Sequence, residues 1–364
     1  MRRVPLGDLT LPIDKSGPSP AKTHFTYVDL SAVNNISKTI DGESITRIEA
    51  APSRARQIIC SDDVIVSTVR PNLNAVALVP PRLSGAIAST GFCVLRARSG
   101  LFPRYLFHWV RCERFIEEMV KSATGASYPA VTESIVKASR IPLPPIEEQR
   151  RIAAILDRTD ALHLRREAAS MKLDLVRKSI FEEMFPTGSF EEATVGEIAE
   201  CLDAQRMPVA AGLRPPGNVP YYGANGQQGW IDRPLFNEPL VLVAEDGGRF
   251  DEPERGVAYK ISGPSWVNNH AHVLRPGSRV NVDYLHQALR HYDFTSLITG
   301  STRSKLNQKQ LKSAPIQIPP LGLQVEFASR LNEIEKIATR FNISLARIGN
   351  LRQGLQAQAF SGGL

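Results

Sequence analysis

An internal repeat with a very long period constrains this chain more than any other feature of its sequence. The segment 141–149, which reads IPLPPIEEQ, recurs 175 residues later as IQIPPLGLQ in 316–324. The apolar positions, the Pro-Pro pair and the final glutamine stay in register, and the offset holds to the end of the chain. Solenoid repeats are only about 20 to 50 residues long, so this period indicates two whole domains, each followed by the same kind of segment.

The globular parts that precede these segments repeat more weakly. The dipeptide Thr-Gly at 124–125 recurs at 299–300 with the same offset, whereas Tyr-Leu at 105–106 recurs at 284–285 with an offset of 179. Loops gained and lost between the copies explain this drift. We therefore expect one shared scaffold that carries two divergent bodies with two different tasks.

Length and composition agree with a two-domain globular protein. A chain of 364 residues suits two ordinary domains, and contents of 42% hydrophobic and 22% charged residues are those of a globular protein. We expect no membrane span, because no run of 18 or more residues is apolar. The N-terminus is basic but is followed by polar and turn residues, which predicts no export signal.

Cysteine usage and net charge indicate the redox compartment of the protein and the class of its partner. The four cysteines stand singly, which predicts neither a disulfide framework nor a metal knuckle and fits a reducing cytoplasm. The net charge of +7 favours a polyanionic partner without proving one.

Each repeated segment predicts a long helix. After Pro145 the chain contains no proline or glycine until Pro186, and its apolar residues recur at helical spacing. The Pro-Pro pair favours an extended backbone just before the helix, and Glu147 and Glu148 suit the positive end of a helix dipole.

The second helix carries a heptad stripe. Its members alternate steps of four and three, and only Arg352 is charged: Phe327, Leu331, Ile334, Ala338, Phe341, Leu345, Ile348, Arg352, Leu355 and Ala359. A sustained 3.5-residue period predicts a seam for another helix. The first helix has a looser stripe, interrupted by Arg166: Ile152, Ile155, Leu162, Leu173, Val176 and Ile180.

Each helix is the natural partner of the other. The alternative is that each packs on its own domain as ordinary core. Forty residues span ~60 Å, more than the width of such a domain, which favours two projecting helices paired antiparallel with one domain near each end.

The fold class that follows is α+β: two similar domains separated by two long antiparallel helices that form a coiled-coil spacer, with a pseudo-two-fold internal repeat. Short β runs such as 63–69 and 240–244, and short amphipathic helices such as 104–110, support this class. The predicted parts are a first domain over 1–145, a first helix over 146–187, a second domain over 188–320 and a second helix over 321–364.

Four loops carry groups that suit nucleic acid. The loop 70–74 combines an arginine with two asparagines, which can bond guanine or adenine edges. The loop 221–229 combines tyrosines, amides and glycines, and 302–307 offers hydroxyls and two cations for phosphates. Taken singly, each loop, like 124–128, is more often a solvated turn. His270 and His272, on alternate strand positions, are expected to pack and not to bind metal.

Sequence patterns of DNA-acting enzymes are missing. No Pro-Pro pair follows Asn or Asp, as an amino-group methyltransferase pocket would require, and no GxxxxGK[ST] phosphate loop exists. No lysine has an acidic residue two positions before it, as in many nuclease metal sites, and no GxSxG elbow occurs. We therefore predict no catalytic residue and no metal site.

The segments 141–152 and 316–327, the ending 359–363 and the loop 221–226 closely resemble the specificity subunit of Type I restriction-modification systems. The resemblance covers essentially the whole chain. It implies that each domain is a target recognition domain that reads one half of a split DNA sequence, while the paired helices act as a spacer and dock modification subunits. The second copy departs from the family where it reads Leu-Gly-Leu-Gln-Val-Glu at 321–326 instead of the more acidic start that the family usually has.

Carried over by position, the resemblance assigns roles to two sets of residues. The set expected to bind DNA is Arg70, Asn72, Asn74, Thr124, Ser127, Tyr128, Tyr222, Asn225, Gln227, Arg249, Asn269, Thr302, Arg303 and Lys305. The set expected to form the spacer and dock subunits is Gln149, Ile152, Leu156, Leu173, Ile180, Gln324, Phe327, Leu331, Phe341, Leu345, Ile348 and Leu355.

The resemblance also implies partners and cofactors. The expected partners are double-stranded DNA and two modification subunits, and the sequence does not decide whether restriction subunits join them. S-adenosylmethionine, ATP and Mg are expected on these partner subunits and none on this chain. Two alternatives stay open: a self-contained DNA methyltransferase or nuclease, and a helical scaffold that does not bind DNA.

Overall fold

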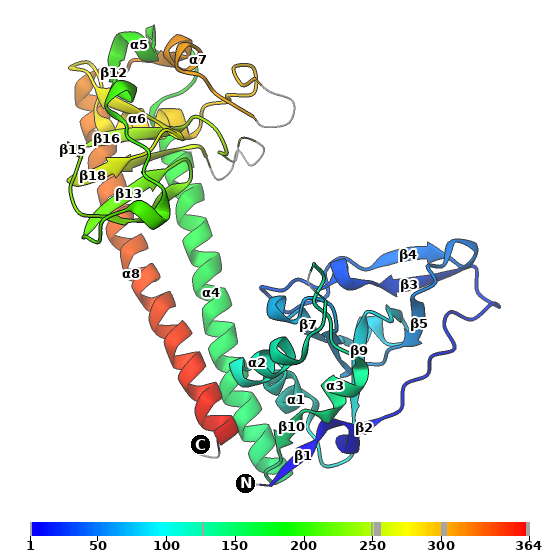
Figure 1. The fold of residues 1–364 in the computed structure, drawn as a ribbon. Helices are drawn as coiled ribbons and strands as arrows, with labels where there is room; N and C mark the ends of the chain where they lie inside the picture. Colours follow the sequence, from blue (N-terminus) through cyan, green and yellow to red (C-terminus); the bar gives the residue numbers. More distant parts are fainter. Residues whose placement is uncertain (1, 126, 249, 251–255, 300–303, 362–364) are drawn as a thin grey trace. The chain divides into compact units, whose positions relative to one another are not determined.

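The computed structural model describes residues 2–125, 127–248, 250, 256–299 and 304–361. The chain divides into two compact units, one made of Met1–Ala168 with Ile343–Leu364 and the other of Ala169–Asn342. Both boundaries fall inside long helices, α4 (Ile146–Met184) and α8 (Leu321–Ser361) (Figure 1). Each unit therefore contains one globular domain, the beginning of one long helix and the end of the other.

The first unit contains a two-stranded ribbon and two four-stranded sheets. The ribbon pairs β1 (Arg3–Pro5) with β10 (Arg140–Pro142). In sheet order, the first sheet is β2 (Thr10–Leu11), β9 (Phe92–Ala97), β6 (Val64–Ser67) and β7 (Val76–Leu78). The second sheet is β4 (Ser44–Arg47), β3 (His24–Val28), β8 (Ile87–Ser89) and β5 (Ala55–Ile58). The short helices are α1 (Pro103–Trp109), α2 (Glu113–Ser122) and α3 (Glu133–Ala138).

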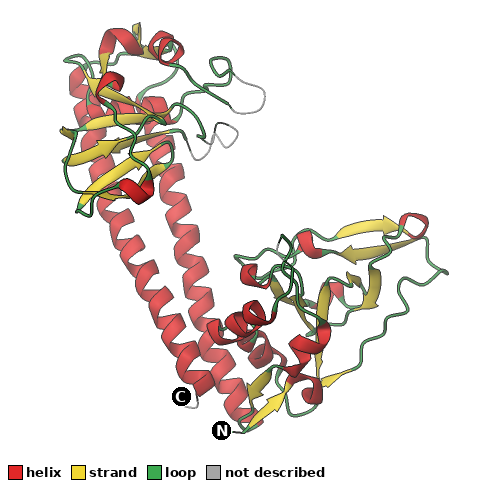
Figure 2. Cartoon of the chain, viewed as in Figure 1, coloured by secondary structure: helices red, strands yellow, loops and turns green. Residues whose placement is uncertain are grey.

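The second unit repeats this plan. Its ribbon pairs β11 (Glu192–Thr194) with β20 (Pro315–Gln317). In sheet order, one sheet is β12 (Ala199–Cys201), β19 (Ala271–Pro276), β16 (Leu240–Ala244) and β17 (Ala258–Ile261). The other is β14 (Gly226–Ile231), β13 (Val219–Gly223), β18 (Pro264–Val267) and β15 (Phe236–Asn237). The short helices are α5 (Val195–Ile198), α6 (Val282–Arg290) and α7 (Gln308–Ser313) (Figure 2).

The strand order is the same in both units. Every strand of the first unit has a counterpart in the second whose label is higher by ten, and neighbours in one unit are neighbours in the other. The parallel pairing of β3 with β8 recurs as the parallel pairing of β13 with β18. The expected two-domain α+β fold on one shared scaffold is therefore confirmed.

The core of the first unit includes residues from both long helices. Ile152 and Leu156, on the first turns of α4, are buried with α1. Phe360, near the end of α8, packs its ring against Tyr105 and Trp109 of α1, with ring centroids 5.3 and 5.2 Å apart. Burial of such large apolar side chains is what fixes both helix segments to this domain.

The second unit uses the matching contacts. Phe185, which directly follows α4, has its ring centroid 4.8 Å from that of Tyr284 on α6 and 5.1 Å from that of Phe327 on α8. Phe181 adds a stacked contact with Tyr284 at 5.8 Å. In each unit, the end of one long helix thus packs against a tyrosine on a short helix. The tyrosine is Tyr105 on α1 in the first unit and Tyr284 on α6 in the second.

The repeated glutamines hold the beginnings of the long helices. Gln149 is fully buried, accepts a hydrogen bond from Phe102 N at 2.8 Å, and donates to the carbonyl oxygens of Gly100 and Pro144, both at 2.9 Å. An amide whose donor and acceptor groups are both used inside the domain is not available to another subunit. It anchors α4, and so its expected role in docking is replaced by one in folding.

Gln324 does the same for α8. It is fully buried, accepts from Asn281 N at 2.7 Å, and donates to the carbonyl oxygens of Arg279 and Pro319 at 3.1 and 2.7 Å. The beginnings of α4 and α8 are therefore each held by the same set of hydrogen bonds from a repeated glutamine.

The heptad stripe is the least exposed face of α8. Its members are all buried or half-buried, while most residues between them are exposed. Of the residues expected on the spacer, Ile152, Leu156, Phe327 and Leu331 are buried in the cores, and Leu173, Ile180, Phe341, Leu345, Ile348 and Leu355 are half-buried. The helix α4 ends at Met184, before the predicted 187, because Pro186 cannot continue it.

No helix among the described residues combines the length and the apolar character that a membrane crossing requires.

We expect Gln149→Ala to lower the free energy of unfolding by about 2 kcal/mol, because it removes a buried bond to the Pro144 carbonyl group and leaves the Phe102 N–H and the Gly100 carbonyl group without their partner. Urea denaturation of the full chain measures this loss, and hydrogen exchange at the Phe102 amide should accelerate. Glu147→Ala, on the exposed face of the same turn, is the matched control and should change stability by less than about 0.5 kcal/mol. Equal losses in the two variants would contradict the anchoring role.

Candidate nucleic-acid interface

The loop from Arg70 to Asn74 joins two buried strands, β6 and β7. Pro71–Leu73 form a single 3-10 turn, and the residues that flank it, Arg70 and Asn74, both adopt left-handed backbone conformations with φ of 49° and 46°. Asn tolerates this region, whereas Arg rarely adopts it. Backbone strain of this kind persists only where the surroundings enforce it, and it concentrates at functional sites.

A second loop lies directly beside this one. Arg70 N donates to the carbonyl oxygen of Pro129 at 2.7 Å, and the Arg70 guanidinium lies over the Tyr128 ring at 4.8 Å from its centroid. Thr124 pairs with Ala130 across the base of this second loop. Arg70 is exposed, and Tyr128 is 68% exposed, so an arginine stacked on a tyrosine faces solvent.

The remaining expected residues of the first unit differ in exposure. Asn72, Thr124 and Ser127 are exposed. Asn74 is buried, and its Nδ2 donates to the carbonyl oxygen of Val110 at 2.8 Å. The structure therefore brings Arg70, Asn72, Thr124 and Tyr128 to one surface, and commits the Asn74 amide to the interior.

The second unit builds its site from the corresponding loops. Residue 130 bridges both Val69 and Thr124 in the first unit, and Lys305 bridges both Asp246 and Thr299 in the second. The connection between β16 and β17 is thus the counterpart of the loop 70–74, and the segment 299–305 is the counterpart of 124–130. Of the expected residues in these loops, Arg249, Thr302 and Arg303 lie outside the described residues.

The hairpin of β13 and β14 adjoins these loops. At its turn, Asn225 Nδ2 donates to the carbonyl oxygen of Gly247 at 2.9 Å. Gln227 and Asn269 are exposed. Tyr222 is half-buried, its ring centroid is 6.1 Å from that of Tyr259, and burial raises its pKa.

A buried charge network supports Lys305. Lys305 Nζ lies 3.1 Å from Glu245 Oε1, and the other oxygen of Glu245 accepts from Arg206 at 2.7 Å. Behind them, the Nδ1 of His272 lies 2.6 Å from Asp203 Oδ2. Burial alone would raise the pKa of Asp203, but its hydrogen bond with His272 and the charge of His272 outweigh burial and lower it to about 2.

The same network contains the atoms of a possible metal cluster. Cys201, Asp203 and His272 each offer one ligand atom, and these atoms lie within 4.8 Å of one another. His272 Nε2 is, however, within hydrogen-bond distance of the Leu306 carbonyl oxygen at 2.8 Å, and Asp203 also accepts from Val273 N at 2.9 Å. These side chains satisfy one another, so the arrangement is that of a hydrogen-bonded support for the loop.

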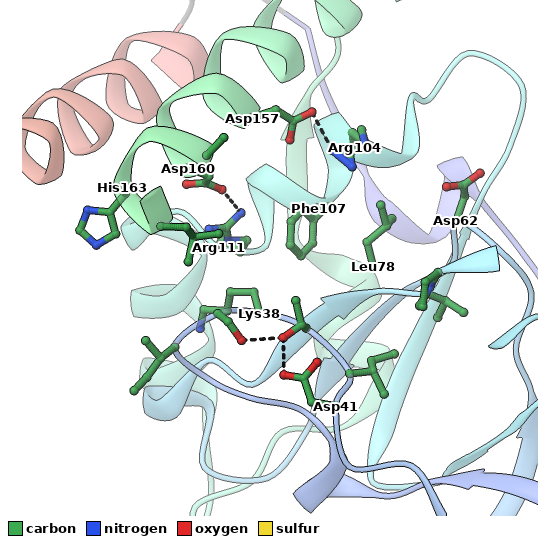
Figure 3. A pocket seen from close by; sticks show the side chains of 18 of the residues that line it. Lys38, Asp41, Asp62, Leu78, Arg104, Phe107, Arg111, Asp157, Asp160 and His163 are labelled. Atoms are coloured by element: carbon green, nitrogen blue, oxygen red, sulfur yellow. Dashed lines mark hydrogen bonds and ion pairs between the residues drawn. The ribbon is translucent and has the colours of Figure 1, made fainter. Parts of the chain in front are cut away.

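The first unit also contains a pocket of about 770 Å³ (Figure 3). Lys38 and Arg111 line it, as does Asp160 of α4, which accepts from Arg111 at 2.5 Å. Lys38 Nζ donates to the backbone carbonyl oxygen of Asn74 at 2.5 Å and to its Oδ1 at 3.2 Å. Sequence analysis missed Lys38, because no local pattern distinguishes it from any other loop lysine.

Comparisons with known proteins agree with this geometry. A family model described as the Type I restriction modification DNA specificity domain matches residues 26–169 and again 188–345. A Haemophilus influenzae protein described as a type I restriction enzyme specificity subunit is 31% identical over 44% of this chain and 42% of its own length. The StySPI specificity subunit of Salmonella potsdam is 21% identical over 93% of this chain and 82% of its own length.

Solved structures also match, among them one that aligns with the whole chain. It concerns complex assembly and conformational transition of the type I R-M system, and its matching chain is 26% identical, with a TM-score of 0.63 over 100% of this chain and 98% of that one. The family model covers both halves of the sequence, each on its own copy of the scaffold. The chain therefore belongs to the Type I restriction-modification DNA specificity family.

Proposed function

We propose that this chain is the DNA-recognition subunit of a Type I restriction-modification complex and carries no catalytic site, and that each unit reads one half of a split DNA sequence. One observation carries the proposal: in both units the same two connections are bridged at corresponding positions on the same strand order. A strongly retained scaffold whose loops differ is what reading two different half-sites requires.

The chemistry of the first unit suits the major groove. An exposed arginine can bond both acceptors of a guanine, and exposed asparagine can bond adenine. Arg70 is held by its backbone bond to Pro129 and by the Tyr128 ring, which limits the conformational freedom it would lose on binding. Thr124 and Ser127 are suited to phosphate contact.

In the second unit, we assign contact with DNA to Gln227, Asn269 and Lys305, which are exposed or partly exposed beside the loops. Arg249, Thr302 and Arg303 keep their expected roles as sequence-based predictions.

We further propose that α4 and α8 pair antiparallel as a coiled-coil spacer and give the chain a pseudo-two-fold repeat. Two observations support this. Each unit contains the beginning of one helix and the end of the other, and the heptad stripe of α8 is its least exposed face. The spacer would set the distance between the two half-sites.

Two modification subunits would dock on the outer faces of these helices. Large apolar side chains are exposed there and contribute to neither core: on α4 these include Met171 and Leu175, and on α8 Ile337, Ile343 and Leu351. The modification subunits would bring S-adenosylmethionine, and restriction subunits, where present, would bring ATP and Mg. We place this assembly in the cytoplasm, with its DNA.

We expect Arg70→Ala to relax sequence selection at one half-site and to leave the other unchanged. Loss of one bidentate base contact costs about 1–3 kcal/mol, or roughly 5- to 150-fold in discrimination at the contacted position. Methylation by the complex of this chain with its modification subunits, on DNA in which both half-sites are randomised, measures the effect. Arg54→Ala, an exposed arginine that belongs to neither of the loops 70–74 and 124–130, is the matched control. An unchanged profile in Arg70→Ala would remove this residue from the reading surface.

The proposed role of the two helices in setting the distance between half-sites is tested by lengthening them. Seven residues inserted into both helices, after Ala168 and after Asn342, keep the heptad phase and lengthen the pair by ~10 Å, close to three base pairs. We expect the selected gap between half-sites to grow by that amount. An insertion in α8 alone should instead disturb the seam and weaken binding. If the double insertion keeps the original gap, the helices do not set the spacing.

Two alternatives predict different outcomes. A self-contained methyltransferase or nuclease would modify or cleave DNA as the purified chain alone. A scaffold for other proteins would show no sequence-dependent DNA binding, with or without modification subunits.

A further inference from the structure

Lys38 belongs to the connection between β3 and β4. It lies in a turn, residues 34–39, that is held by hydrogen bonds between the residues of the turn. Lys38 N donates to the carbonyl oxygen of Asn34 at 2.9 Å, and Asn34 N donates back across the turn to the carbonyl oxygen of Thr39 at 3.0 Å. The Asn34 side chain accepts from Ile36 N at 2.9 Å. Lys38 itself has a left-handed backbone with φ of 60°. The direction in which its side chain leaves the backbone is therefore largely set before any contact forms.

The Lys38 ammonium ends on Asn74, at the far end of the loop that begins with Arg70. It donates to both the backbone and the side-chain oxygen of Asn74. On its other side, Asn74 donates to the Val110 carbonyl oxygen just after α1. Asn74 is thus held by Lys38, from the connection between β3 and β4, and by Val110, at the end of α1. These bonds keep Asn74 in the left-handed conformation with which the loop ends.

The surroundings of Lys38 do little to stabilise its charge. Burial, with the charges of Arg111 and Arg352, lowers the pKa of Lys38 to about 8. The nearby Asp160 pairs with Arg111 at 2.5 Å and lies 3.6 Å from Arg352 (Figure 3). Among the described residues, no carboxylate forms an ion pair with Lys38, and its hydrogen-bond acceptors are the two oxygens of Asn74. A half-buried ammonium without a counter-ion is unfavourable for stability alone.

The second unit has a related contact, which holds the beginning of the loop where Lys38 holds its end. Asn225 lies in the connection between β13 and β14, which are the counterparts of β3 and β4. Its Nδ2 donates to the carbonyl oxygen of Gly247, which lies in the β16–β17 loop and has a left-handed backbone with φ of 63°. In both units, a side chain from one hairpin connection (β3–β4 or β13–β14) bonds the carbonyl oxygen of a left-handed residue. That residue lies in the loop between β6 and β7 or between β16 and β17.

We propose that Lys38 and Asn225 are positioning residues for DNA specificity, each of which fixes the recognition loop of its own unit from a neighbouring sheet. This rests on the proposed function of the loops. Selection at one half-site then depends on a residue that does not itself contact a base. In the second unit, the positioning role replaces the direct base contact expected of Asn225.

The test uses the full chain with its modification subunits. Lys38→Ala is expected to lower discrimination at the half-site read by the first unit by about tenfold, which corresponds to ~1.4 kcal/mol, without changing selection at the other half-site. Asn225→Asp, which keeps size but removes the donor, should act only on the second half-site. Lys38→Arg retains a cationic donor and should restore part of the selection. Lys121→Ala, a solvent-exposed lysine on α2, is the matched control.

A readout without DNA separates positioning from direct contact. Lys38→Ala should speed hydrogen exchange at the Leu73 and Asn74 amides, which donate to Arg70 and Pro71 within the turn, and should leave exchange in the second unit unchanged. Thermal denaturation of each variant reports any general loss of fold.

Several results would overturn the proposal. If Lys38→Ala weakens methylation of all sequences equally and reduces the salt dependence of binding, Lys38 is a phosphate contact. If selection and exchange both stay as in the wild type, the contact with Asn74 has no role in recognition. If instead the wild-type complex selects no split sequence at all, the proposed function itself fails, and that result is recognised before any variant is made.

Discussion

The buried amides of Gln149 and Gln324 are the constraint on which the rest of the structure depends. Each bonds backward to a carbonyl oxygen of its own Pro-Pro segment, Pro144 or Pro319, and sideways to a loop beside α1 or α6. Because both glutamine side chains are fully buried, water does not readily replace these bonds, and the direction in which each long helix leaves its domain is fixed. Any domain that retains this entry can present the same helix, however much its loops diverge.

In each unit, burial restricts the sequence of the strands, whereas the loops that join them are able to vary. The strands β6 and β16 are buried along their whole length, so their sequences are restricted to small or apolar residues. The loops at their ends are free of that restriction. Arg70 and Gly247 occupy matching loop positions, one residue after the bridged Val69 and Asp246, and both are left-handed. The left-handed backbone at this one position is thus retained while its side chain changes.

The sequence predicts those parts of the fold whose signal is local and periodic. The heptad stripe and the Pro-Pro segments predicted α4 and α8, because helical periodicity is a property of neighbouring residues. It could not show that Gln149 points inward or that Asn74 is buried, since an amide looks the same in a loop, a core or a binding surface. Nor does it indicate Lys38, whose acceptor lies 36 residues away, in a loop that joins two strands of another sheet.

Polar contacts, rather than apolar packing, hold the recognition loops in place. Lys38 and Asn74 support the loop of the first unit, and His272, Asp203, Arg206 and Glu245 support Lys305 in the second. For stability alone, apolar residues of similar volume would serve as well as such buried charges. Apolar contacts are non-directional and tolerate small displacements, whereas a hydrogen bond weakens steeply when its angle changes. A loop that must meet base edges gains more from directional contacts, and we infer that the charges are retained behind the loops for this reason.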